Sequence, residues 1–149
     1  MNIVILDGGV LNPGDVDWSP IAALGQLRVH DATPPHLLEE CARDADILLT
    51  NKTPLRKKDA HALRNVRMVG LLSTGYDVVD LDMFTERGVP VCNVVAYGVS
   101  DVAQHAAALL LELCRRTSLH TESVKSGEWS RRQTWCYWKS TPLCLEGLT

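Results

Sequence analysis

The chain has 149 residues, of which 46% are hydrophobic and 22% are charged, proportions that are typical of a folded globular protein. Its formal net charge of −3 argues against a basic surface of the kind that binds nucleic acids or anionic membranes. No apolar run approaches the roughly 20 residues that cross a bilayer. We therefore expect no nucleic-acid partner and no membrane partner.

The five cysteines are dispersed without a C-x-x-C pair, which is typical of free thiols in a reducing compartment. The histidines are equally scattered and form no metal-binding spacing, so we expect no metal site. The sequence starts with an apolar stretch at residues 2–6. No basic segment with a cleavage site precedes it, so we expect no signal peptide and predict a cytoplasmic protein.

Five short apolar runs alternate with helix-forming stretches over the first 98 residues. Asp17 or Ser19 is placed to cap the first helix, and Thr33 is placed to cap the second, which has prolines in its first turn. Asp80 is placed to cap the last of these helices, and Gly88 is placed to end it. The predicted strands are residues 2–6, 27–30, 45–50, 68–72 and 89–92, and the predicted helices are residues 20–24, 34–42, 57–63 and 81–87.

This alternation predicts an α/β fold, because strands separated by helices form a parallel sheet with helices on both faces. We expect a flavodoxin-like sheet of five parallel strands and assign residues 1–98 to this domain. After it, residues 99–116 contain no glycine or proline and predict one long helix. Its apolar residues spread over more than one narrow stripe, so we expect it to pack against another subunit or a further domain.

The remainder of the chain has a different character. A second helical piece at residues 119–125 completes a helical arm that we assign to residues 99–126. The segment 127–149 holds three of the four tryptophans but shows no clear periodicity, so we predict an extended segment. Its aromatic residues fit packing between domains or subunits better than base stacking, because the chain has no basic stripe.

Three loops follow predicted strands, and ligands gather at the carboxyl edge of a parallel sheet. These loops are residues 7–9, 51–53 and 73–76. The stretch 71–80 (LLSTGYDVVD) predicts a strand that enters a turn at Gly75 and then a helix, whose first N–H groups are free to bind an anion. An ordinary β–α connection is the alternative. Lys52 is either a cation at the mouth of this cleft or a solvated loop lysine.

Other polar residues have simpler explanations than catalysis. His105 lies on the long helix, where a packed or interfacial histidine is favoured over a general acid or base. Asp77 and Asp80 are three residues apart, and capping at the helix start explains both without a pair of catalytic carboxylates.

Several motifs together resemble the D-2-hydroxyacid dehydrogenase family. The two main ones are residues 71–80 and residues 93–113 (NVVAYGVSDVAQHAAALLLEL). Further matches, which occur in the family's order along the whole chain, are residues 6–8 (LDG), 11–15 (LNPGD), 51–55 (NKTPL), 127–129 (GEW), 136–138 (CYW) and 141–143 (TPL). The last three resemble the glycerate dehydrogenase (hydroxypyruvate reductase) branch.

The resemblance implies where a small 2-hydroxy or 2-oxo acid would bind. It places the substrate carboxylate on the N–H groups around Ser73, Thr74, Gly75 and Tyr76. It also places Thr74 against an NAD or NADP cofactor and Val102 near the nicotinamide. Two local departures from the family pattern concern the segment before Val102: Val95 stands where proline is frequent, and residues 98–100 (GVS) replace a more polar run.

One motif of the family does not occur in this sequence. No G-x-G-x-x-G is found, although dinucleotide-binding Rossmann domains carry it. The family's arginine, acidic residue and histidine lie beyond that motif. We therefore expect the substrate domain and dimerisation helices (99–126) of a dehydrogenase, without the Rossmann nucleotide-binding domain, without a catalytic residue, and inactive alone. The alternative is a stand-alone flavodoxin-like module that binds a small anion or a partner.

Overall fold

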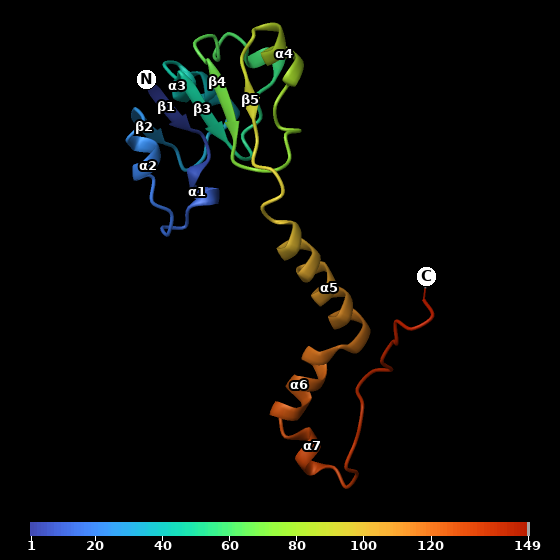
Figure 1. Cartoon of the computed structure of the whole chain (residues 1–149). Helices are drawn as coiled ribbons and strands as arrows, with labels where there is room; N and C mark the ends of the chain where they lie inside the picture. The colour runs from blue at the N-terminus through green and yellow to red at the C-terminus, as the bar shows by residue number, and fades with distance from the viewer. Residues whose placement is uncertain (149) are drawn as a thin grey trace. The chain divides into compact units, whose positions relative to one another are not determined.

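The computed structural model describes residues 1–148 and divides into two units, residues 1–97 and residues 98 onward (Figure 1). The first unit holds a five-stranded parallel sheet in the order β2-β1-β3-β4-β5. This order is the flavodoxin-like one, so the predicted fold class is confirmed. The strands are β1 (Asn2–Ile5), β2 (Gln26–Val29), β3 (Ile47–Thr50), β4 (Met68–Leu71) and β5 (Val91–Cys92).

Short helices connect these strands. Because the β1-to-β2 step runs opposite to the later steps across the sheet, right-handed crossovers place the connections on both faces. Helices α3 and α4 pack on one face, where they share a core with the strands, and α2 lies against the edge strand β2. The helical segments are α1 (Gly8–Leu11), α2 (Ser19–Ala22), η1 (Pro35–Leu37), α3 (Leu38–Ala42), η2 (Lys57–Asp59) and α4 (Leu81–Glu86).

The main core lies between the sheet and the α3 and α4 side. Alternate strand residues point to this face, as the period of a β-strand requires. The cluster combines the strand residues Val4, Leu48, Val69 and Leu71 with Leu38, Ala42, Met83 and Phe84 of the helices. Phe84 is fully buried. The predicted alternation of strands and helices therefore encloses one apolar layer.

Two predicted helices differ from the structure. Residues 57–63 form only the turn η2 and further turns, and after them the Leu63 carbonyl accepts both the Val66 N–H at 3.1 Å and Arg87 Nη2 at 2.7 Å. Thr33 does not cap a helix. Its buried hydroxyl donates to the Leu6 carbonyl at 2.6 Å, and this tertiary partner displaces the cap. Helix α1 was not predicted, because its two glycines give no helical signal.

Gly25 closes the turn between α2 and β2 under the first residue of the chain. A Cβ added at Gly25 would lie 2.4 Å from the Met1 carbonyl oxygen, which already accepts the Gln26 N–H at 2.9 Å. We expect Gly25→Ala to lower the free energy of unfolding by about 1–3 kcal/mol through overpacking. Urea denaturation measures this loss. Gly98→Ala is the matched control, because nothing lies within 4 Å of its added Cβ; equal losses in both variants would contradict the steric explanation.

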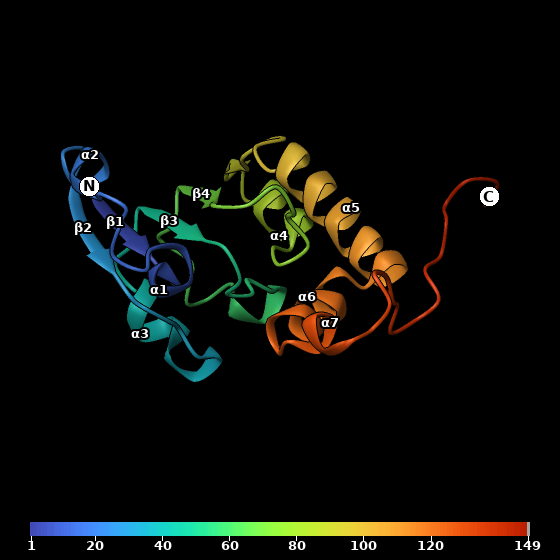
Figure 2. The same cartoon turned by 90° about the horizontal axis from the view of Figure 1, so that it is seen from below.

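The second unit is helical and then irregular. Helix α5 (Val99–Arg115) confirms the predicted long helix, and α6 (Thr117–Lys125) starts two residues before the predicted one. Arg116, with φ of 47°, adopts the left-handed conformation that separates them. The segment predicted as extended holds one further helix, α7 (Glu128–Arg131), which contacts α6 (Figure 2). No helix among residues 1–148 is both long and apolar enough to span a membrane.

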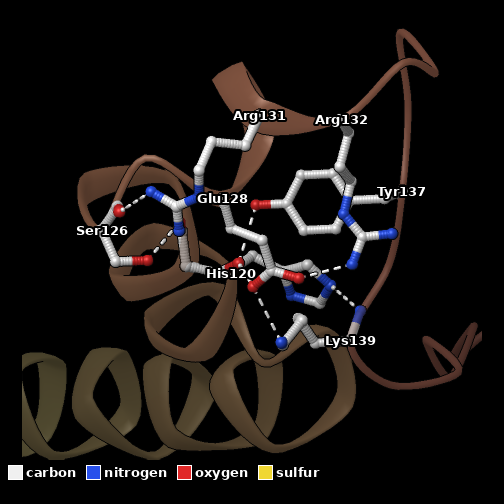
Figure 3. A network of polar contacts seen from close by, with 8 residues as sticks. His120, Ser126, Glu128, Arg131, Arg132, Tyr137 and Lys139 are labelled. Atoms are coloured by element: carbon white, nitrogen blue, oxygen red, sulfur yellow. Dashed lines mark hydrogen bonds and ion pairs between the residues drawn. The ribbon is translucent and has the colours of Figure 1, made fainter.

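A polar network ties the irregular segment to α6 and α7 (Figure 3). Glu128 accepts hydrogen bonds from Lys139 Nζ at 2.8 Å, from Ser123 Oγ at 2.6 Å and from Arg132. The Arg132 guanidinium stacks over the Tyr137 ring at 4.4 Å. On the other side, the Lys139 N–H donates to His120 Nε2 at 3.1 Å. These contacts hold residues 132–139 along α6 without any regular secondary structure.

The network makes the stability of the second unit depend on pH. The hydrogen bonds from Lys139, Ser123 and Arg132 lower the pKa of Glu128 from 4.5 to about 2. A depressed folded-state pKa contributes stability above 4.5 that is lost as the pH falls towards 2. We expect Glu128→Gln to lower the thermal midpoint of tryptophan fluorescence at pH 7 and to match the wild type near pH 2. A difference that stays constant from pH 7 to pH 2 would contradict this assignment.

Candidate functional site

Two loops run side by side at the carboxyl edge of the sheet. We call residues 51–55 the Lys52 loop and residues 72–80 the Gly75 loop; they follow the neighbouring strands β3 and β4. At one end, the Leu72 N–H donates to the Thr50 carbonyl at 2.8 Å. At the other end, Leu55 pairs with Val79 in an isolated bridge. The two loops are therefore fixed against each other at both ends, as a preformed ligand site requires.

The Gly75 loop has its carbonyl groups occupied. The Ser73 carbonyl accepts the Val94 N–H at 3.1 Å, and the Tyr76 carbonyl accepts the Val79 N–H at 3.0 Å. Between them, the Thr74 carbonyl accepts from Asn93 Nδ2 and the Gly75 carbonyl accepts from the Ser73 hydroxyl, each at 2.8 Å. With every carbonyl of residues 73–76 held, the orientation of this backbone is determined.

The N–H groups of the same four residues have no partner among residues 1–148. Thr74, Gly75 and Tyr76 are also exposed to solvent. Backbone N–H groups left unpaired in a fixed loop are strong hydrogen-bond donors, and consecutive ones form a site for a carboxylate or a phosphate. The structure thus brings together four of the predicted substrate-binding residues as a row of backbone donors.

The N–H groups of residues 73–76 are not those of a helix N-terminus, contrary to the sequence-based prediction. Helix α4 begins at Leu81, where it is predicted, after the bridge that joins the two loops. Asp80 caps it, since its carboxylate accepts the Met83 N–H at 3.1 Å, as predicted. Asp77 does not cap a helix; its carbonyl instead accepts a hydrogen bond from Arg56 Nη1 at 2.8 Å. The free N–H groups therefore lie in a loop that is held by the neighbouring loop, and they do not belong to the first turn of a helix.

The Lys52 loop has the opposite arrangement, because a buried carboxylate takes its N–H groups. Asp7 Oδ1 accepts the Asn51 N–H at 2.8 Å, and Asp7 Oδ2 accepts the N–H of Lys52 and, at 2.7 Å, that of Thr53. Asp7 is only 3% exposed, so the predicted 7–9 loop does not offer this residue to a ligand. Lys52 itself is exposed, and its ammonium forms no salt bridge among residues 1–148.

The two residues predicted to touch a cofactor lie in different units. Thr74 Oγ1 donates to the Val94 carbonyl at 2.9 Å, so its hydroxyl holds the chain after β5. Val102 is exposed on α5 of the second unit. His105 is exposed on the same helix rather than packed. The five cysteines are free thiols, and residues 1–148 hold no cluster of metal-ligating side chains.

Sequence reasoning missed the residues that hold these loops. In the sequence, Asn93 stands out only as the start of a family motif, yet its amide fixes the Thr74 carbonyl. Asp7 stands out only as part of a strand-end loop and of the family match at residues 6–8. The available signal was the position of each residue directly after a buried strand, which places it at the ligand edge of the sheet.

The chain belongs to the D-isomer-specific 2-hydroxyacid dehydrogenase family, whose catalytic-domain profile matches residues 3–141. It is 44% identical over 150 residues to the hydroxypyruvate reductase of Blautia hydrogenotrophica, covering 99% of this chain and 47% of that protein. It is 29% identical to the glycerate dehydrogenase of Methylorubrum extorquens, covering 78% of this chain and 37% of the relative.

Solved structures show the same fold. An NADPH-dependent glyoxylate/hydroxypyruvate reductase from Sinorhizobium meliloti superimposes with a TM-score of 0.70 at 20% identity, covering 98% of this chain and 44% of that one. A 2-hydroxyacid dehydrogenase from Ketogulonicigenium vulgare gives a TM-score of 0.69 at 21% identity, covering 94% and 44%. The chain therefore spans less than half the length of these relatives.

Proposed function

We propose that this chain is the substrate-binding part of an NAD(P)-dependent D-2-hydroxyacid dehydrogenase of the glycerate dehydrogenase (hydroxypyruvate reductase) type. One observation carries the proposal: residues 73–76 present unpaired N–H groups while their carbonyls are all held. A carboxylate accepts several such hydrogen bonds at once, and charge-assisted bonds are stronger than neutral ones. The relatives named for hydroxypyruvate and glycerate support a small 2-oxo or 2-hydroxy acid as the ligand.

Lys52 complements the cradle in this proposal. The Lys52 loop lies beside the Gly75 loop. An ammonium there attracts the anion and donates a hydrogen bond to the oxygen on C2 of the acid. Because this lysine is exposed, solvent screens the attraction, and its contribution is smaller than that of the backbone donors. Ser73, Thr74, Gly75 and Tyr76 thus bind the carboxylate, and Lys52 faces the remainder of the acid.

The proposed cofactor, NAD or NADP, fits these 149 residues poorly. The sequence offers no G-x-G-x-x-G to hold a pyrophosphate, and the Thr74 hydroxyl is already committed to Val94. Thr74 and Val102 remain proposed contacts at the edge of a cofactor held elsewhere. A bound nicotinamide supplies the hydride in reactions of this class, and no hydride step is assigned to the residues of this chain.

Binding is tested with pyruvate and its methyl ester, which differ in the carboxylate. We expect pyruvate to shift the amide NMR signals of Thr74, Gly75 and Tyr76 in the 149-residue chain. Loss of the charge weakens binding of the ester by about tenfold or more, because about 1.4 kcal/mol corresponds to a factor of ten. Equal shifts with both compounds, or shifts only outside residues 51–55 and 72–80, would refute the carboxylate cradle.

Turnover is tested separately. We expect the purified chain to oxidise NADH and NADPH at the background rate in the presence of hydroxypyruvate or glyoxylate. The reason is the missing glycine-rich motif and the absence of an assigned proton donor. Measurable reduction of either acid would overturn this part of the proposal.

We also propose a homodimer held by helices within residues 99–126, in the cytoplasm, where free thiols are stable. The apolar residues of α5 repeat at alternating spacings of three and four, which is the pattern of paired helices. They are Val99, Val102, Ala106, Leu109 and Leu113. The two leucines are 54% and 75% exposed, so a second copy of the helix would bury this leucine end of the stripe. A packed position for His105 depends on that second copy.

A stand-alone anion-binding module is the second candidate, because unpaired backbone donors bind inorganic anions as well as carboxylates. Such a module would bind phosphate or sulfate at residues 73–76 at least as tightly as pyruvate. It would also remain monomeric. If the chain binds the 2-oxo acid more tightly than phosphate or sulfate and also forms a dimer, the dehydrogenase proposal is favoured over the stand-alone module.

A further inference from the structure

Asp7 is a buried carboxylate without a basic partner among residues 1–148. A buried charge is costly unless hydrogen bonds compensate it. Here all the compensation comes from β3 and the Lys52 loop. The donors are the N–H groups of Asn51, Lys52 and Thr53, and the hydroxyls of Thr50 at 3.1 Å and Thr53 at 3.2 Å.

This arrangement is an internal anion site. Three successive N–H groups that converge on one anion form a nest, and the carboxylate of Asp7 occupies it. The Thr50 hydroxyl closes the turn further, because it also accepts the Thr53 N–H at 3.1 Å. An external anion therefore finds no backbone donor in residues 51–53, and Lys52 can contribute only through its side chain.

We propose that Asp7 is a positioning residue for the anion site, which acts by fixing the Lys52 loop so that the Lys52 ammonium stays beside residues 73–76. This inference rests on the proposed function, because it assigns a ligand to the Gly75 loop. Asp7 touches no ligand. It sets the conformation of the Lys52 loop, which together with the Gly75 loop lies between the Thr50–Leu72 hydrogen bond and the Leu55–Val79 bridge.

A purely structural role for Asp7 predicts a different pattern of binding. If Asp7 only stabilised the fold, its loss would weaken pyruvate binding to the same extent with or without the lysine charge. If Asp7 acts through Lys52, the loss of Asp7 has no further effect on pyruvate binding once the lysine charge has been removed. A double-mutant cycle separates these cases, because coupled residues give non-additive effects.

The experiment measures pyruvate dissociation constants by NMR for the 149-residue chain and for Asp7→Asn, Lys52→Met and the double variant. We expect each single variant to bind about fivefold more weakly, which corresponds to about 1 kcal/mol. We expect the double variant to bind as weakly as Lys52→Met alone. Additive losses, or unchanged binding by Asp7→Asn, would overturn the proposal.

Two further variants keep the test decisive. Asp46→Asn is the matched control, since the Asp46 carboxylate accepts the Asn2 N–H at 2.7 Å at the opposite edge of the sheet; it should lower stability without changing pyruvate binding. Thr50→Val removes one donor to Asp7 with an isosteric side chain. This variant replaces Asp7→Asn in the test if Asp7→Asn does not fold. It should weaken pyruvate binding, and only in a chain that retains Lys52.

Amide hydrogen exchange separates this inference from the proposed function. We expect the N–H groups of Asn51, Lys52 and Thr53 to exchange faster in Asp7→Asn, while those of β1 and β4 keep their protection. Slow exchange retained in the variant overturns the positioning role, whatever binds. If exchange is faster in the variant but the chain binds no pyruvate, the proposed function is refuted. Asp7 then fixes the loop, but the loop has no role in binding an anion.

Discussion

Replacing Phe84 by alanine will lower the free energy of unfolding of the first unit by about 3–5 kcal/mol. Phe84 is the single phenylalanine of the chain, is 0% exposed and packs from α4 into the core beside β4. Its removal forfeits apolar burial and leaves a cavity between helix and sheet. Domains of this size are stable by only about 5–15 kcal/mol, so the loss is a large share. Urea denaturation followed by far-ultraviolet circular dichroism measures it.

Leu81→Ala is the matched control for this prediction. Leu81 lies on the same helix, but its side chain is 39% exposed, so its truncation costs much less than that of Phe84. Phe84→Leu should fall between the two, because it keeps most of the apolar volume. Similar stability of Phe84→Ala and Leu81→Ala would show that α4 is not seated on the sheet as described.

A charge on the apolar stripe of α5 will convert the proposed dimer into a monomer. Leu113 belongs to the stripe and is exposed in the single chain. In a paired helix, Leu113→Asp would bury two like charges without partners, which costs several kcal/mol and raises the dimer dissociation constant at least about a hundredfold. Light scattering should report 16.4 kDa for the variant and twice that mass for the wild type.

Gln104→Asp provides the control, because Gln104 lies on the opposite side of α5 from Leu113, nine residues or two and a half helical turns away. The same charge placed there should leave the dimer intact. Dissociation by both variants would indicate a net-charge effect. A wild-type chain that is already monomeric would remove the homodimer from the proposed function and favour the stand-alone module.

Much of the fold was predictable because its signals are local. The five strands were found from short apolar runs, and Asp80 and Gly88 marked the ends of α4 as the rules for helix caps require. The long α5 was equally clear from its lack of helix breakers. The errors occurred where a distant partner decided the conformation. The Thr33 hydroxyl, for example, donates to the Leu6 carbonyl, 27 residues earlier in the chain, and does not cap the following helix.

The position of the candidate site was predictable, but its physical basis was not. The order of the strands and the resemblance to a family placed residues 73–76 at the ligand edge of the sheet. Neither gave the role of Asn93 or Asp7, because each acts on a backbone segment that is distant in sequence. The start of α4 at Leu81 is as predicted, but the free N–H groups of residues 73–76 do not belong to a helix start. They lie in a loop held by the pairing of Leu55 with Val79, and no local pattern reports that pairing.

The occupied carbonyls of the Gly75 loop have a consequence for how this site tolerates change during evolution. The atoms offered to the ligand are N–H groups, which every residue except proline carries. Substitutions at Tyr76, whose side chain is exposed, can therefore leave the donors in place. For the proposed site, we expect selection to act instead on Asn93 and Ser73, because their side chains hold the carbonyls. Homologues that keep the binding function should vary freely at Tyr76 and conserve the two supporting residues.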